Sequence, residues 1–62
     1  MDRIEMTRVL LRGVEFLAGG KVNAKVSFRI VSTAEDTHAV VKNGDARWKV
    51  SVDGENWIAK SY

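Results

Sequence analysis

The chain contains no cysteine and no proline, and it has a single histidine. Without cysteine it forms no disulfide, and His38 alone cannot supply the ligands of a zinc site. A domain of 62 residues therefore lacks two common ways of stabilising a small core. Below about 70–80 residues, one hydrophobic core seldom yields more than about 3–5 kcal/mol. We expect self-association to supply the missing stability.

Long hydrophobic runs are also missing. The apolar run Val9–Leu11 ends at Arg12, whereas a membrane span needs about 18 apolar residues. Asp2 and Glu5 stand where a signal peptide carries positive charge. The absence of cysteine fits a reducing compartment. We therefore expect a cytoplasmic protein that makes no contact with membranes.

The composition is nevertheless that of a folded protein. Hydrophobic residues make up 45% of the chain and charged residues 29%, which is far from the composition of disordered segments. The chain has no internal repeat, no low-complexity tract and no linker. We expect a single small domain over residues 1–62.

Residues 2–18 have the pattern of an amphipathic helix. Asp2 can cap it, Glu5 stands in the capping-box position, and Gly19-Gly20 supplies a left-handed stop. On a helical wheel the charged residues of this segment share one narrow stripe, and most other positions are apolar. The charged residues are Glu5, Arg8, Arg12 and Glu15.

Gly13 argues against this helix, because glycine costs about 1 kcal/mol in a helix interior. The competing interpretation makes residues 6–17 a strand with a bulge at Gly13. The chain would then be all-β or have a ββαββ order. We favour the helix.

Residues 21–31 predict a half-buried strand, because apolar and polar residues alternate with a period of two. The apolar positions are Val22, Ala24, Val26, Phe28 and Ile30. Residues 32–36 then read as a loop.

Two turn signals divide the rest of the chain. Asn43-Gly44 and Asp53-Gly54 are preferred pairs for type I′ hairpins. They predict strands over 38–42, 45–52 and 55–60. A competing interpretation makes 34–43 a short helix capped by Thr33 and stopped by Gly44.

The two hairpins fix which side chains share a face of the sheet. With two-residue turns, Val41 would face Ala46 and Val50 would face Trp57. We predict an α+β fold in which the N-terminal helix packs on one face of a four-stranded antiparallel meander. The apolar face would hold Val22, Val26, Phe28, Ile30, Ala39, Val41, Trp48, Val50, Val52 and Trp57.

The opposite face of this sheet collects basic side chains, although the net charge is only +2. Such a cluster attracts phosphates or a carboxylate-rich surface. An ordinary solvated face with edge lysines that block strand pairing explains the same pattern. The candidate residues for binding an anionic partner, a nucleic acid or an acidic protein, are Lys25, Arg29, Lys42, Arg47, Lys49 and Lys60.

The tryptophans do not belong to this candidate surface. Sheet-type readers of nucleic acid stack bases on exposed aromatic residues, whereas Trp48 and Trp57 fall on the core side. Any nucleic acid would therefore be held through backbone charge and shape.

The helix is apolar over more of its circumference than one small sheet can cover. We predict that the spare flank forms a homodimer through Met6, Leu10, Phe16 and Leu17. The alternative function is a small protein-interaction or inhibitor protein of the phage or mobile-element type. It would contact a host protein through this flank or through a sheet edge.

No catalytic constellation is visible in the sequence. His38 has Lys49 as its expected cross-strand neighbour and no carboxylate to orient it. We expect no metal and no cofactor. The sequence predicts a non-catalytic binding module that engages an anionic macromolecule through the basic face of its sheet.

Overall fold

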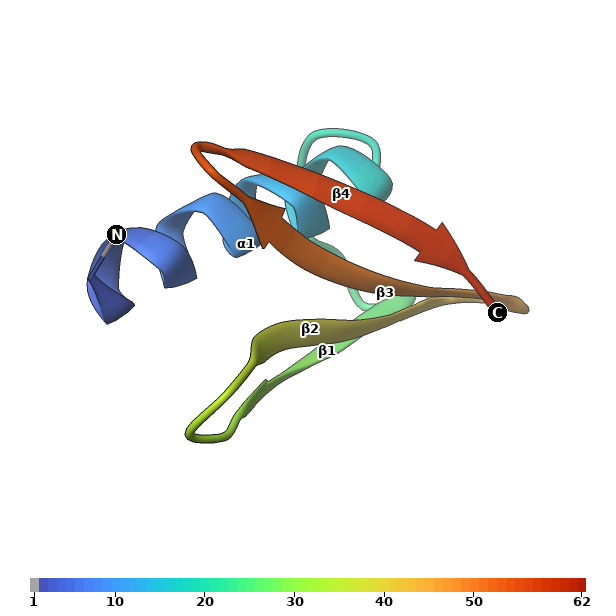
Figure 1. Cartoon of the computed structure of the whole chain (residues 1–62). Helices are drawn as coiled ribbons and strands as arrows, with labels where there is room; N and C mark the ends of the chain where they lie inside the picture. The colour runs from blue at the N-terminus through green and yellow to red at the C-terminus, as the bar shows by residue number, and fades with distance from the viewer. Residues whose placement is uncertain (1) are drawn as a thin grey trace.

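The computed structural model describes residues 2–62, which form one helix and one sheet (Figure 1). The four strands are antiparallel and follow one another in chain order across the sheet. The predicted α+β fold is confirmed, and the bulged strand over 6–17 is wrong. The elements are α1 (Arg3–Leu17), β1 (Val26–Ser32), β2 (Thr37–Asn43), β3 (Ala46–Asp53) and β4 (Asn56–Ser61).

Both ends of α1 carry the predicted caps. The Oδ1 atom of Asp2 accepts a hydrogen bond of 2.8 Å from the backbone N–H of Glu5. At the other end Gly19 has φ +83°, and the N–H of Gly20 donates to the carbonyl of Glu15 at 2.7 Å. This pairing is a Schellman motif, which glycine permits at no steric cost. The helix thus begins and ends within one residue of the predicted bounds 2–18.

At Gly13 the backbone of α1 lies close to the sheet. A Cβ atom on this residue would stand 2.8 Å from Cγ1 of Val50 and 2.9 Å from the ring of Trp57. No side chain fits there without displacing one of these two residues. The glycine that weakens the helix in isolation therefore permits its close packing on β3 and β4.

Strand β1 is shorter than predicted, because it begins at Val26 and not at residue 21. The Oδ1 atom of Asn23 accepts from the N–H of Lys25 at 2.8 Å, and its carbonyl accepts from the N–H of Val26. This local turn removes the preceding residues from the sheet. Val22 is exposed as a result and does not belong to the apolar face.

Both hairpins are shifted by two residues from the predicted pairing. Val41 lies opposite Trp48 and not Ala46, and Val50 lies opposite Ala59 and not Trp57. The turns are Gly44-Asp45 and Gly54-Glu55, and only the two glycines have positive φ, +62° and +63°. Glycine at the first central position alone fits a type II′ turn, so the type I′ assignment is wrong. A slip of two residues keeps every side chain on its predicted face.

The loop between β1 and β2 replaces the alternative helix over 34–43. The hydroxyl oxygen of Thr33 accepts from the N–H of Asp36 at 3.0 Å, and the N–H of Thr33 donates to the carbonyl of Asp36 at 2.7 Å. Thr33 therefore closes a tight turn in place of capping a helix, and β2 begins at Thr37.

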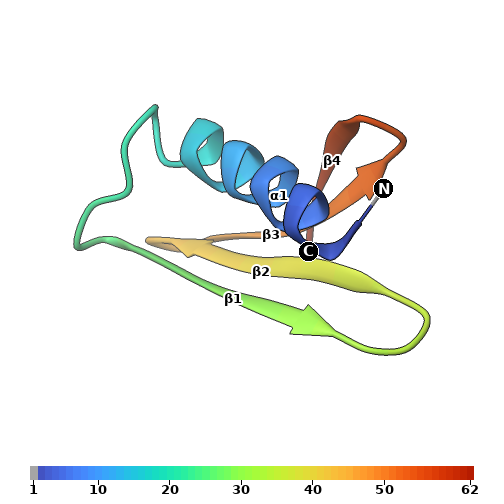
Figure 2. The same cartoon turned by 90° about the vertical axis from the view of Figure 1, so that its left-hand side faces the viewer.

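The core lies between α1 and the part of the sheet formed by β2, β3 and β4, which the helix contacts most, and it also includes Val26 at the start of β1. Figure 2 shows α1 above this part of the sheet, with β1 running along its outer edge. The limited reach of the helix leaves Phe28 of β1 39% exposed, although it lies on the apolar face. The core residues are Leu10, Val14, Val26, Ala39, Val41 and Val50, with Val9 also buried.

The helix of the described residues is too short and too polar to cross a lipid bilayer.

Candidate functional site

The face of the sheet turned away from α1 carries the predicted basic side chains. One row crosses all four strands and contains Arg29, Val40, Lys49 and Lys60 in that order. The neighbouring row contains Ser27, Lys42 and Arg47. All five cations are exposed. We call this surface the basic face and define it by Arg29, Lys42, Arg47, Lys49 and Lys60.

Lys25 does not belong to the basic face. It lies in the turn that Asn23 forms before β1, outside the strand that was expected to orient it. The structure thus brings together five of the six predicted anion-binding residues.

The basic face contains two pairs of cations, and the two members of each pair lie directly opposite each other on neighbouring strands. Lys42 is paired with Arg47 between β2 and β3, and Lys49 is paired with Lys60 between β3 and β4. Directly opposed residues have Cα atoms about 4.5–5.5 Å apart, and like charges at this spacing repel. Among residues 2–62, none of the five cations forms an ion pair with a carboxylate. No carboxylate of the described chain therefore offsets this repulsion at ion-pair distance.

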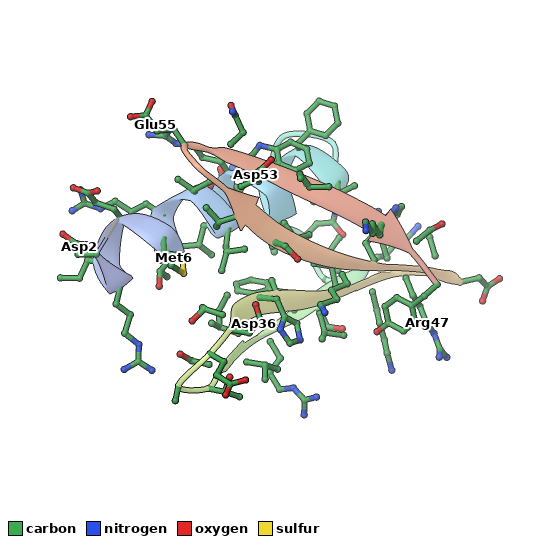
Figure 3. All side chains as sticks on the ribbon, in the orientation of Figure 1. Asp2, Met6, Asp36, Arg47, Asp53 and Glu55 are labelled. Atoms are coloured by element: carbon green, nitrogen blue, oxygen red, sulfur yellow. The ribbon has the colours of Figure 1, made fainter. Side chains whose placement is uncertain are left out.

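Several acidic residues lie away from the basic face. Figure 3 shows Asp2 and Glu55 at the end of the molecule where the helix begins, and Arg47 at the opposite end. Asp45 is an exception, because it lies in the turn between β2 and β3, next to the basic face. The five exposed cations of the basic face nevertheless produce a local positive field that the small net charge conceals.

His38 has a carboxylate partner, contrary to the sequence-based expectation. Its Nδ1 atom lies 2.8 Å from Oδ2 of Asp36, and its cross-strand neighbour is Ser51 and not Lys49. An ionised carboxylate only accepts hydrogen bonds, so Nδ1 is the donor and Nε2 is the ring atom left for a ligand. Asp36 thus orients the imidazole of His38. No hydrogen bond within the described chain joins this imidazole to the hydroxyl of Ser51.

Tyr62 extends the basic face and was missed in the sequence. Its backbone N–H donates to the carbonyl of Arg47 at 3.2 Å, which continues the pairing of β4 with β3 beyond Ser61. Tyr62 therefore has the same parity as Lys60, and the residue is 67% exposed. The sequence could have indicated this position, because residues 60 and 62 lie on the same face when the strand is continued to Tyr62.

An open hollow of about 440 Å³ lies beside Tyr62 on this side of the sheet. Lysines and apolar groups share its wall, so the hollow offers both positive charge and contact area. Its lining residues are His38, Val40, Lys49, Lys60, Ser61 and Tyr62.

The residues predicted to form a homodimer do not form one exposed surface. Leu10 is completely buried in the core, so its assignment to the spare flank of the helix is wrong. Met6 and Leu17 are half-buried, and Leu17 packs against the core. Phe16 is 70% exposed and lies against Trp57, with ring centroids 5.2 Å apart. Self-association itself stays a prediction.

No family model matches this chain, and comparison with curated proteins and with solved structures finds no match either.

Proposed function

We propose that this protein is a non-catalytic module that binds an anionic macromolecule through the basic face. The observation that carries the proposal is that four of the five cations face each other across neighbouring strands, Lys42 opposite Arg47 and Lys49 opposite Lys60. None of these four side chains has a carboxylate partner among the described residues. A bound polyanion would neutralise both pairs at once, because they lie side by side on the uncovered side of β3.

The dimensions of the basic face favour an extended partner. The row from Arg29 to Lys60 crosses three inter-strand spacings of about 4.8 Å each, or about 14 Å in all. A nucleic acid strand carries one phosphate for about every 3.4 Å of helix axis. The row is therefore long enough for on the order of four phosphates. Nucleic acid is the partner class that these dimensions support best.

Salt dependence tests the proposal directly. If the five cations contact phosphates, the logarithm of the affinity for duplex DNA falls with the logarithm of salt concentration, with a slope of about −0.9 per contact. We expect a total slope of about −3 to −5 from fluorescence anisotropy with a labelled oligonucleotide. A slope near zero, or the absence of binding at low salt, would contradict the proposal.

Charge reversal with a matched control locates the contact. The double variant Arg29→Glu/Lys49→Glu should lose at least about 100-fold in affinity, because it changes the charge of the basic face by four. The control Arg8→Glu/Lys21→Glu makes the same change at exposed residues of α1 and of the segment after it. It should lose about tenfold or less, through the net charge alone. Equal losses of affinity in the two double variants would show that the basic face is not the binding site.

The alternative function, contact with a host protein through the helix flank or a sheet edge, predicts a different outcome. Binding of such a partner would depend little on salt and would survive the Arg29→Glu/Lys49→Glu variant. The exposed Phe16 is the residue of that flank best placed for such a contact.

A further inference from the structure

The hollow beside Tyr62 differs chemically from the rest of the basic face. Of the hollows on this side of the sheet, this one alone among the described residues combines two lysines with an exposed tyrosine ring, and the half-buried side chain of Val40 adds an apolar wall. A site for simple anions needs no apolar wall. The combination fits a ligand that carries a negative charge and a flat apolar group within a few ångströms of each other.

We propose that this hollow is the subsite for one unpaired nucleotide of a single-stranded nucleic acid, a proposal that rests on the function proposed above. The base lies against the ring of Tyr62 and the methyl groups of Val40. Its phosphate lies between the ammonium groups of Lys49 and Lys60.

The positions of the two lysines support the phosphate contact. Lys49 and Lys60 are directly opposed on neighbouring strands, so both flexible side chains can reach one anion. An anion between them converts a repulsive pair into two attractive contacts. The hollow is thus anchored on the paired strands β3 and β4 and not on a loop.

The base contact rests on Tyr62 and His38. The hydrogen bond from the backbone N–H of Tyr62 to the carbonyl of Arg47 fixes the backbone of Tyr62 beside β3. The residue itself is exposed. Exposed aromatic rings beside cationic groups are the usual platforms for unpaired bases. His38 is held by Asp36 through Nδ1, which leaves Nε2 for a polar edge of the base. A duplex buries its bases in the stack and cannot use this subsite.

The test compares two ligands of equal charge. One is an oligothymidylate of about eight nucleotides, and the other is an abasic oligonucleotide of the same length. The variant Tyr62→Leu removes the ring but keeps an apolar side chain at an exposed position. We expect it to weaken binding of the oligothymidylate about five- to hundredfold and binding of the abasic strand less than about twofold. Tyr62→Phe, which keeps a ring, should bind both ligands as the unchanged protein does.

The outcomes separate the two proposals. If Tyr62→Leu binds both strands as tightly as the unchanged protein, or weakens both equally, the nucleotide subsite is wrong while the basic face stands. If the unchanged protein binds polyglutamate more tightly than the oligothymidylate, and Tyr62→Leu alters neither affinity, an acidic protein is the favoured partner and the subsite is wrong. If the unchanged protein binds none of these polyanions, the proposed function itself fails. Circular dichroism of Tyr62→Leu confirms that the fold is retained.

Discussion

The two faces of the sheet are built from alternate residues of the same strands, yet they differ in almost every physical property. The face under α1 contains Ala39, Val41 and Val50, all without exposed surface. The opposite side contains their direct neighbours in sequence, Val40 and Lys49, and none of the five cations that define the basic face forms an ion pair within the described chain. Packing on one face holds the molecule together, and charge on the other stays available to a partner. Substitutions should therefore separate stability from binding.

The largest effect is expected on the covered face. Leu10→Ala removes a completely buried side chain and should cost about 2–5 kcal/mol. A chain of this size has about 3–5 kcal/mol in total, so much of the population should unfold at room temperature. Urea titration followed by circular dichroism measures the change. Lys49→Ala, on the basic face, should change stability by less than about 0.5 kcal/mol.

A sharper comparison uses two adjacent valines of β2. Val41→Thr places a hydroxyl in the apolar core without a partner and should cost about 1–3 kcal/mol. Val40→Thr makes the same chemical change on the opposite face and should cost less than about 0.5 kcal/mol. Thermal unfolding of the two variants is the measurement. Similar losses in both would mean that the two faces contribute equally to stability.

The smallest effect is expected at Gly13, where two forces oppose each other. Alanine gains about 1 kcal/mol of helix propensity, but its Cβ would stand 2.8 Å from Val50. Overpacking of this kind costs about 1–3 kcal/mol, so Gly13→Ala should lower stability by about 1 kcal/mol net. Arg12→Ala, at an exposed position of the same helix, should be close to neutral. A more stable Gly13→Ala protein would show that the helix can move away from the sheet.

The parity of the strands could be predicted from the sequence, whereas their register could not. The dipeptides Asn43-Gly44 and Asp53-Gly54 located both hairpins. The predicted central turn residues were off by one position, however, and this error shifts the cross-strand partners by two residues. Alternation has a period of two, so this error left Lys49 and Val50 on their correct faces. For this reason five of the six candidate cations were placed correctly.

Other features depended on contacts that no sequence pattern records. The helical wheel shows that α1 is broadly apolar, but it does not show that Leu10 lies in the core while Phe16 remains exposed. The role of Gly13 depends on a contact with residues about 40 positions later in the chain. The pairing of His38 with Asp36 is local, yet it depends on the turn that Thr33 closes.

The strands β1 and β4 form the two edges of the sheet, but α1 packs on β2, β3 and β4. Strand β1 therefore has the least support against local opening. Its amide hydrogens should exchange with solvent sooner than those of β3, which is flanked by strands on both sides. Arg29 is carried by this weakly held edge, whereas Lys49 and Lys60 are carried by the protected half of the sheet. On warming, the cationic row would therefore shorten from one side before the molecule as a whole unfolds.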